Sequence, residues 1–216
     1  VKALGPGAYQ ALQGPRRAGE PAPMLGEMEK LGVAVLFPWD AAYPPLLSGI
    51  PQAPSLLYAL GDPGILAGPA LALVGTRNAS SYGRDMAFSI ARDLGRRGVT
   101  VVSGLARGID AAAHEGCLQG GGRTAAVLGS GLDVVYPGEH RELARRMLQA
   151  GGLLLSEYPL GSRPAAYHFP DRNRIISGVS HGAVLMEGRL KGGGMITVHH
   201  ALEQGREVFA LPGPAN

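Results

Sequence analysis

Short, mainly apolar runs recur along the chain from residue 71 to residue 211, and amphipathic segments follow most of them. The runs lack the polar alternation of a strand with one face in water, which favours buried strands. Strands that alternate with helices are typical of a parallel sheet with helices on both faces. The pattern therefore predicts an α/β fold, with an extended, Rossmann-like, doubly wound and mostly parallel sheet. The expected strands are 71–74, 99–102, 124–128, 153–155, 183–186 and 207–211, and the expected helices are 81–97, 108–119, 139–150, 172–179 and 197–203.

The first 38 residues do not show this regular pattern. They are rich in Gly, Pro and Ala, and we expect one short helix at 24–31 and one strand at 33–37. We interpret residues 1–38 as a small N-terminal appendage, a partial or degenerate helical region. Residues 39–216 then form the main domain.

The main domain begins with a lead-in that is interrupted by proline. Prolines at positions 44, 45, 51 and 54 exclude long regular elements, because proline removes a backbone donor and fixes φ. One short strand is expected at 56–60. Trp39 and Tyr43 could be packing residues or could stack on bases, and we favour packing for both.

The charge balance is close to neutral, with 20 Lys and Arg against 17 Asp and Glu and a formal net charge of +3. This is not the strongly basic composition that by itself indicates nucleic-acid binding. Seventeen of the 20 basic residues are Arg, whose planar guanidinium suits phosphate and stacks on bases. A GC-rich genome would produce the same bias.

The composition also indicates the compartment. There is no run of about 18 apolar residues, which excludes a membrane span, and the N-terminus lacks the pattern of a signal peptide. Cys117 is the single cysteine and cannot form an internal disulfide, so we interpret it as a small apolar residue on a helix. These features predict a cytoplasmic protein with no membrane partner.

Ligands of such sheets bind beyond the carboxyl ends of the strands. Five of the six expected ends carry Gly, in most cases beside a polar or charged side chain, which indicates close backbone approach to a ligand rich in oxygen. At the first end, Gly75, Thr76 and Arg77 precede a helix expected to begin at Ser81. Because free N–H groups at a helix N-terminus bind anions, we predict that this turn holds a phosphate.

A second dense stretch runs from Tyr167 to Arg174 and combines two Arg, one Asn, one His and two aromatic residues. Aromatic faces stack on bases, and Arg side chains and helix N-termini bind phosphates. The stretch follows a long loop that can lie over the same sheet edge. We predict that it forms the opposing wall of a groove for several nucleotides; the alternative is a solvated helix start with Asp171 as its N-cap.

Motifs for dinucleotides, ATP and metals are missing. The G-x-G-x-x-G pattern does not follow strand 71–74, and Ser103 stands where a ribose-binding acid is expected, which disfavours NAD and FAD. There is no Walker A sequence. His199 and His200 are adjacent and point in different directions, and no Cys–His cluster exists. We expect no cofactor and no metal.

Two pairs of side chains leave a catalytic role open. Asp110 and His114 share a helix face, so they could form an acid–base pair or a hydrogen bond that orients the helix. Glu157 and Glu187 end neighbouring strands and could converge for hydrolysis, or they could orient the arginines of the second dense stretch. We assign no catalytic residue.

The chain carries six motifs in order between residues 39 and 216: GTRNASSYG, VVSGLARGIDAAAH, AVLGSGLDVVYP, LLSEYPLG, FPDRNRIISG and ITVHHALEQGREVFALPG. In these motifs it resembles the DNA-processing protein A family (DprA, also called Smf). The resemblance implies a protein that is not an enzyme and that binds single-stranded DNA in natural transformation. It further implies that the protein protects the strand and helps load RecA recombinase onto it in place of single-strand-binding protein, which is itself a candidate partner.

The resemblance also implies a homodimer formed through the Rossmann-like domain, and it relates residues 1–38 loosely to the family's helical SAM-like domain. Its GS/TR loop, SGxAxGID segment and FPxRNR segment carry the DNA contacts. Together with the Gly-rich strand ends, the expected nucleic-acid-binding residues are Gly75, Thr76, Arg77, Ser103, Gly104, Ala106, Arg107, Gly129, Ser130, Gly131, His168, Phe169, Arg172, Asn173, Arg174, Gly193 and Gly194.

The chain departs from the family pattern in two places. Gly193 and Gly194 stand where a Ser-Gly pair is usual, so a hydroxyl is lost. Residues 197–203 read TVHHALE where many members have TARLALE. The second departure touches the segment 197–211, where we expect the dimer contact because a terminal edge strand is free to pair.

An enzyme remains as the alternative function. A nucleotide phosphoribohydrolase of the lysine-decarboxylase-like (LOG) kind shares the Rossmann-like layout, a Gly-rich helix start and a catalytic Glu. Glu187 followed by residues 192–194 is the feature that favours it, but the fuller PGGxGTxxE motif is absent because His200 stands where its Glu is required. A dinucleotide-binding or scaffold role is disfavoured by the missing glycine pattern.

Overall fold

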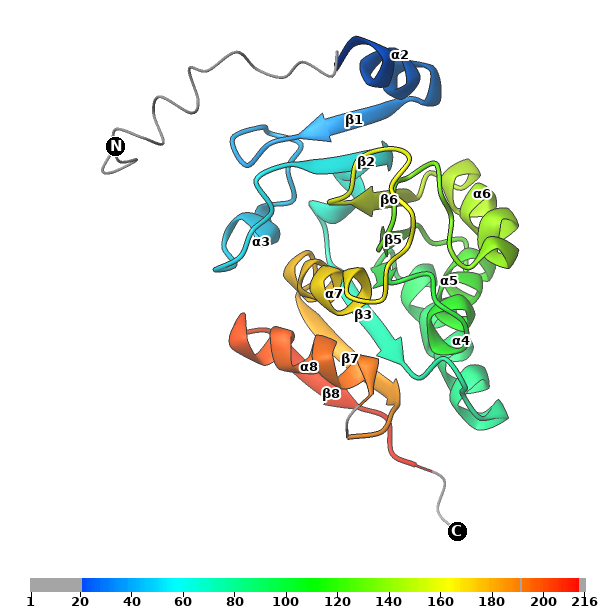
Figure 1. The fold of residues 1–216 in the computed structure, drawn as a ribbon. Helices are drawn as coiled ribbons and strands as arrows, with labels where there is room; N and C mark the ends of the chain where they lie inside the picture. The colour runs from blue at the N-terminus through cyan, green and yellow to red at the C-terminus, as the bar shows by residue number, and fades with distance from the viewer. Residues whose placement is uncertain (1–20, 191, 214–216) are drawn as a thin grey trace.

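The computed structural model describes residues 21–190 and 192–213, which form a single eight-stranded sheet with helices on both faces (Figure 1). The strand order is β1-β2-β6-β5-β4-β3-β7-β8. The strands are β1 (Val33–Leu36), β2 (Leu57–Gly61), β3 (Ala70–Gly75), β4 (Thr100–Ser103), β5 (Thr124–Leu128), β6 (Leu153–Ser156), β7 (Gly182–Glu187) and β8 (Glu207–Ala210).

Six of these strands form a parallel block, from β6 at one side to β8 at the other. β2 pairs antiparallel with β6, and β1 pairs antiparallel with β2. β1 therefore runs in the same direction as β6, and its carboxyl end lies at the same sheet edge as those of the parallel block. The mostly parallel, doubly wound α/β fold expected from the hydrophobic pattern is confirmed.

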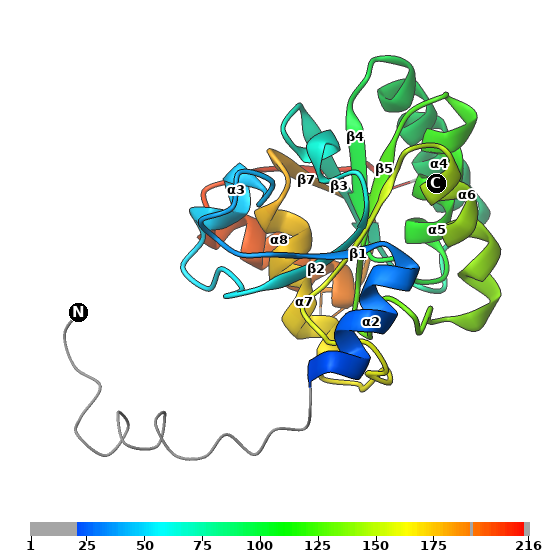
Figure 2. The ribbon, with the colours of Figure 1, turned by 90° about the horizontal axis from the view of Figure 1, so that it is seen from above.

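The helices divide between the two faces of the sheet, as Figure 2 shows from above. Ala72 and Val74 of β3 pack into the core on one face, while Leu73 packs on the other. Such alternate burial requires cover on both sides, which explains why the strand reads as a continuous apolar run. One face carries α4 (Ser81–Arg96), α5 (Ile109–Gln119) and α6 (Arg141–Gln149), and the other carries α3 (Pro45–Ser48), α7 (His168–Gly178) and α8 (Gly193–Glu203).

Two helices begin about one turn earlier than expected. α7 begins at His168, so Pro170 lies in its first turn, where the missing N–H has no intrahelical partner in any case. Asp171 is consequently inside the helix, and the alternative that made it the N-cap of a solvated helix start is wrong. α8 begins at Gly193, ahead of the expected residue 197.

The first part of the chain joins the same sheet. Residues 1–20 lie outside the described residues, α2 (Pro21–Leu31) precedes β1, and Met28 and Val33 belong to the core on the α6 face. The boundary after residue 38 stays a prediction.

The short 3₁₀ helices η1 (Pro63–Leu66) and η2 (Gly138–His140) were not expected. Across the described residues every helix is too short or too polar to cross a bilayer.

The two aromatic residues of the lead-in have opposite environments. Tyr43 is 3% exposed, and its hydroxyl donates to the carbonyl oxygen of Pro54 at 2.8 Å. Trp39 is 79% exposed, so its expected role as a packing residue is wrong. Cys117 is buried on α5, as expected for a small apolar side chain.

Candidate nucleic-acid interface

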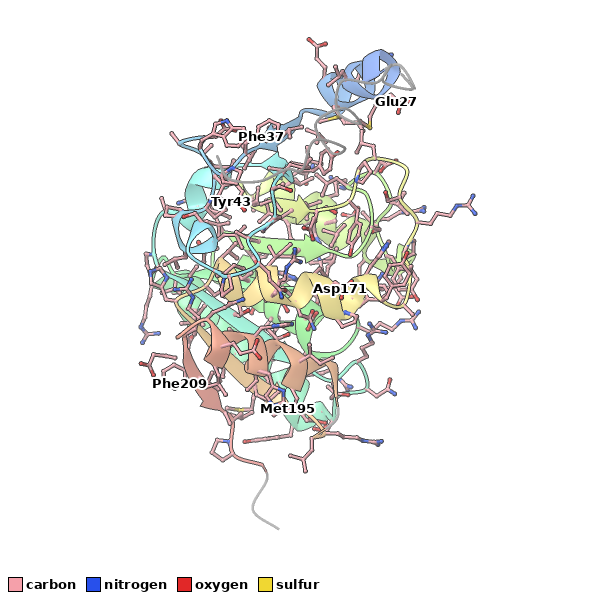
Figure 3. The ribbon with its side chains drawn as sticks, turned by 60° about the vertical axis from the view of Figure 1, so that its left-hand side comes forward. Glu27, Phe37, Tyr43, Asp171, Met195 and Phe209 are labelled. Carbon is pink, nitrogen blue, oxygen red and sulfur yellow. The ribbon has the colours of Figure 1, made fainter. Side chains whose placement is uncertain are left out.

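A groove of about 660 Å³ follows the carboxyl ends of the central strands, between the first turns of α7 and α8. Asp171 and Met195 mark these turns in Figure 3. A second pocket of about 40 Å³ opens beside it and includes Gly104 and Arg107 in its lining. Of the expected nucleic-acid-binding residues, the groove is lined by Gly75, Thr76, Arg77, Ala106, Phe169, Arg172, Asn173, Gly193 and Gly194.

An exposed cation and two aromatic rings form the centre of this surface. The guanidinium carbon of Arg77 lies 5.0 Å from the ring centroid of Phe169, a cation–π geometry. Tyr136 is 47% exposed, and its ring centroid lies 5.6 Å from that of Phe169. The cluster offers aromatic faces and a positive charge at one place, which suits a base and its phosphate.

Sequence reasoning missed Tyr136 and Arg189, although both follow a strand at the ligand-binding edge. Tyr136 belongs to the loop after β5, and Arg189 comes two residues after the end of β7. Both line the groove. Neither Arg77 nor Arg189 has an ion-pair partner within the described part of the chain, and both side chains are exposed.

Arg172 has a different role from the one expected. Its side chain is buried, at 3% exposure, and Nη1 donates to the carbonyl oxygens of Gly104, at 3.0 Å, and Val127. Burial lowers the pKa of its guanidinium to about 10, while the neighbouring Asp110 acts in the opposite direction. Arg172 is thus a charged residue that fixes two strand ends, and it is not freely available to a phosphate.

Asp110 completes this internal network. Its carboxylate accepts from the backbone N–H groups of Gly104 and Ala106, at 3.1 and 3.2 Å. Burial raises the pKa of Asp110, and the nearby Arg172 together with these two hydrogen bonds opposes the shift. Because both N–H groups already have an anionic acceptor, the loop after β4 does not offer them to a ligand.

The glycines at the strand ends are explained by packing between protein segments. A Cβ atom on Gly104 would lie 2.2 Å from Nη2 of Arg172, and one on Gly75 would lie 2.5 Å from Ile109. A Cβ on Gly194 would lie 3.1 Å from the Cα of Gly75, so the two backbones meet directly. The expected close backbone approach is present here, but protein atoms occupy it.

At the N-terminus of α4, where the sequence suggested an anion, the structure places a carboxylate of the protein itself. The Glu187 carboxylate accepts from the backbone N–H of Ser80 at 3.1 Å and from its hydroxyl at 2.7 Å, and the same hydroxyl accepts from the N–H of Gly83. A protein carboxylate therefore fills the positive end of this helix. The phosphate predicted at the turn of Gly75, Thr76 and Arg77 stays a prediction, but the N–H groups of Ser80 and Gly83 already have acceptors and are not available to it.

α8 presents the helix N-terminus that faces the groove. Its N-cap is Gly192, which has no side chain to cap the first turn. The N–H groups of Gly193 and Gly194 have no hydrogen-bond acceptor among residues 21–190 and 192–213, and both residues line the groove. This helix end can therefore accept an anion, since free N–H groups at a helix N-terminus bind anions.

Two further arginines expected to contact phosphate are held by carboxylates. Arg107 donates to both oxygens of Glu139, at 2.7 and 2.8 Å, and this hydrogen bonding lowers the pKa of Glu139. Arg174 donates to both oxygens of Glu157, at 2.7 and 2.8 Å, with its side chain 14% exposed. Of the roles left open for Glu157, the orientation of an arginine is confirmed.

The remaining expected residues lie behind the groove and not in its lining. The hydroxyl of Ser103 donates to the carbonyl of Leu73 at 2.7 Å, and that of Ser130 donates to the carbonyl of Val134. Gly131 is buried and donates its N–H to Ser162. Nδ1 of His168 lies 3.0 Å from the carbonyl oxygen of Gly129. These residues support the groove from within the sheet edge.

The candidate catalytic pairs do not form. Nδ1 of His114 lies 2.7 Å from the hydroxyl oxygen of Thr124, whose proton is donated to the carbonyl of Val101, so His114 donates from Nδ1. Burial lowers the pKa of His114 to about 3. Asp110 accepts hydrogen bonds from the N–H groups of Gly104 and Ala106. Glu157 follows β6 and Glu187 ends β7, and three strands separate β6 from β7, so the expectation that they end neighbouring strands is wrong; they also hold different partners. Among the described residues no cluster of His, Cys, Asp and Glu could hold a metal ion.

Comparison with known proteins connects this groove to a family. The family model for DNA recombination-mediator protein A matches residues 34–216. Protein Smf of Escherichia coli K12 is 48% identical over 180 residues, or 83% of this chain and 48% of the relative. DNA processing protein DprA of Bacillus subtilis is 44% identical over 172 residues, or 79% of this chain and 58% of the relative. The chain thus spans about half the length of the curated relatives that it matches.

Two solved structures are similar over most of the chain. DNA processing protein A from Streptococcus pneumoniae matches with a TM-score of 0.84 and 38% identity, covering 98% of this chain and 72% of that one. The protein from Helicobacter pylori, described for its single-stranded DNA binding mode, matches with a TM-score of 0.77 and 29% identity, covering 85% and 82%. With these findings and the collinear motifs, the chain belongs to the DNA recombination-mediator protein A family, that of the DprA and Smf proteins.

Proposed function

We propose that the groove binds single-stranded DNA without sequence preference. The observation that carries this proposal is the exposed guanidinium of Arg77 over the ring of Phe169, at 5.0 Å, in the lining of the groove. Stacking on an aromatic ring accepts any base, and a phosphate contact carries no sequence information. The family, and the single-strand binding described for the Helicobacter pylori protein, point to the same ligand.

The charges around the groove support an anionic ligand. Arg77 and Arg189 are exposed cations in its lining, and the open N-terminus of α8 adds donors at the same side. Phosphate contacts release counterions, so affinity should fall steeply as salt rises. A volume of about 660 Å³ suits a short stretch of one strand.

A gel-shift or anisotropy titration over a range of salt concentrations tests this proposal. We expect single-stranded DNA to bind more tightly than duplex of the same length, and Arg77→Ala to weaken all sequences alike while reducing the single-strand salt slope by ~0.7. Arg97→Ala is the matched control, because Arg97 caps the far end of α4 and is exposed. Equal binding by wild type and Arg77→Ala would contradict the site.

We propose that the whole protein acts in natural transformation, where it protects incoming single strands and helps load RecA recombinase in place of single-strand-binding protein. The support is family membership and the DNA-processing names of the relatives. RecA filament assembly on strands coated with single-strand-binding protein should be faster with the protein than without it. An unchanged rate would contradict the loading role.

We propose a homodimer that forms through α8 and β8. β8 is an edge strand of the sheet in the described chain, and it carries the exposed side chain of Phe209, at 52% (Figure 3). Leu202 on α8 is 58% exposed. Exposed edge strands and apolar side chains are surfaces that partners cover. Sedimentation should give a dimer for wild type and a monomer for Phe209→Glu.

We propose that the protein acts by binding and not by catalysis. The phosphoribohydrolase alternative depended on Glu187, but this carboxylate is engaged by Ser80 at the start of α4. Incubation with nucleoside monophosphates should release no free base. Release that Glu187→Gln abolishes would restore the enzymatic alternative.

A further inference from the structure

Trp39 is a large aromatic side chain that is exposed at a fixed position. Its ring lies parallel to that of Phe37, with centroids 5.1 Å apart and an interplanar angle of 1°. The side chain is nevertheless 79% exposed. One face of the indole therefore stacks on Phe37, and most of the rest of the ring is open to solvent.

The turn that carries Trp39 is held by hydrogen bonds. The carboxylate of Asp40 accepts from the N–H of Phe37 at 2.8 Å, and the N–H of Asp40 donates back to the carbonyl of Phe37 at 2.9 Å. Pro38 fixes one more backbone angle between them. Because the ring is already ordered, a ligand that stacks on it loses little of the binding energy to conformational entropy.

The position of this turn relates it to the groove. Val35 of β1 is opposite Tyr58, Tyr58 is opposite Ser156 of β6, and Ser156 is opposite Leu128 of β5. These four residues lie in one row across the sheet, three strand spacings or ~14 Å wide. Phe37 follows one end of the row by two residues, and Gly129, against which Phe169 packs, follows the other end by one.

Further aromatic rings lie between these two ends. Tyr158 follows Ser156 of β6 by two residues and stacks on His168, with centroids 3.8 Å apart. His168 directly precedes Phe169, and Tyr167, 67% exposed, meets His168 edge-on at 4.6 Å. The carboxyl edge thus carries rings after β1, after β6 and over β5, in the order of the strands. Figure 3 labels Phe37 at one end of this series and Asp171, in the first turn of α7, near the other.

We propose that Trp39 is a second base-stacking platform for the single strand held in the groove. This inference rests on the proposed function and extends its site from Phe169 to the far side of the sheet. The ~14 Å of the row is measured along the sheet, and a strand that also passes over the rings of Tyr158 and His168 has a longer path, so only the longer oligonucleotides reach both platforms. The ligand at Trp39 is a nucleobase of any kind, because every base presents a flat face.

The chain offers a direct test, because Trp39 is its single tryptophan. The 216-residue chain is titrated with oligothymidylates of about 4 to about 16 nucleotides, the range of single-strand site sizes. Anisotropy of an end label reports binding, and tryptophan emission reports contact with Trp39. We expect the longest strands to quench the emission at saturation and the shortest strands to leave it unchanged.

Substitutions give the second measurement. Trp39→Ala should lower the affinity for the longest strand by at least roughly 5-fold, which corresponds to the weakest base–aromatic stacking. The affinity for the shortest strand should not change. Trp39→Phe should retain most of the affinity. Circular dichroism should be unchanged, since the side chain is 79% exposed.

The outcomes separate the two proposals. If no oligonucleotide binds, both the proposed function and the second platform are wrong. If the longest strand binds with unchanged emission, or binds Trp39→Ala as tightly as wild type, only the second platform is overturned. Emission that changes with protein concentration in the absence of DNA would assign Trp39 to a contact between copies of the chain, and would also overturn it.

Discussion

Replacing Glu139 with Gln should strengthen the binding of single-stranded DNA, because the change frees a cation at the edge of the groove. Arg107 donates to both carboxylate oxygens of Glu139, at 2.7 and 2.8 Å. The two side chains are 60% and 52% exposed, so a phosphate can reach them. The hydrogen bond from Arg107 lowers the pKa of Glu139, and the carboxylate therefore stays charged and competes with phosphate at neutral pH.

A freed Arg107 should add about one phosphate contact, since it lies in the small pocket with Arg77 and Phe169. One contact with a single strand steepens the slope of log K against log salt by ~0.7. The gain in affinity of Glu139→Gln should then shrink by roughly 2.6-fold when salt rises from about 50 mM to about 200 mM.

Fluorescence anisotropy of a labelled oligothymidylate at several salt concentrations measures both the affinity and the slope of log K against log salt. The matched control is Glu142→Gln, which removes an equal charge from an exposed pair with Arg145 on α6, outside the groove lining. Glu142→Gln should change neither the affinity nor the salt slope. A gain from Glu139→Gln that persists in an Arg107→Ala background, or that leaves the salt slope unchanged, would refute the reasoning.

Three further substitutions test the internal contacts of the site. Gly104→Ala should lower the free energy of unfolding by ~1–3 kcal/mol in urea titrations, because its Cβ would lie 2.2 Å from Arg172; unchanged stability would contradict the close packing. Glu187→Gln should cost ~1 kcal/mol of stability through the α4 N-terminus and leave single-strand affinity as in wild type; a large loss of affinity would instead assign Glu187 to the binding surface. Because burial lowers the pKa of His114 from 6.5 to about 3, the unfolded chain binds a proton below pH 6.5 that the folded chain does not. Stability should therefore fall by ~2 kcal/mol between pH 6.5 and pH 5, and His114→Leu should flatten this pH dependence even if it lowers stability throughout.

The hydrophobic pattern was sufficient to predict the sheet. Runs such as 71–74 and 124–128 are buried on both faces, so each residue in them is apolar or small and the strand is evident from the sequence. The start of α7 was not evident, because Pro170 reads as an interruption. The glycines at 192–194 were expected to lead into a helix, but the helical pattern itself is evident only from residue 197. Both are compatible with a first helical turn, where N–H groups have no intrahelical acceptor.

The site could be predicted only in part. Arg77 and Phe169 were found because they follow a strand and open a helix, and these are positions that topology brings to one edge. The state of the other arginines was not accessible from the sequence. Arg107 is held by a carboxylate 32 residues away, and Arg174 by one 17 residues away. Whether a cation is free depends on such tertiary partners, which local patterns do not specify.

The distribution of negative charge inside the site favours recognition of any sequence. Asp110 holds the N–H groups after β4, and Glu187 holds the start of α4. Two positions where a phosphate could be bound by a rigid ring of N–H donors are thus filled by the protein's own carboxylates. The groups left for the proposed DNA ligand are exposed arginines, aromatic faces and the first turn of α8, which can hold phosphates and stacked bases whatever the sequence. The groove should therefore hold a strand through its backbone and stacked bases, and it should tolerate the strand in any register.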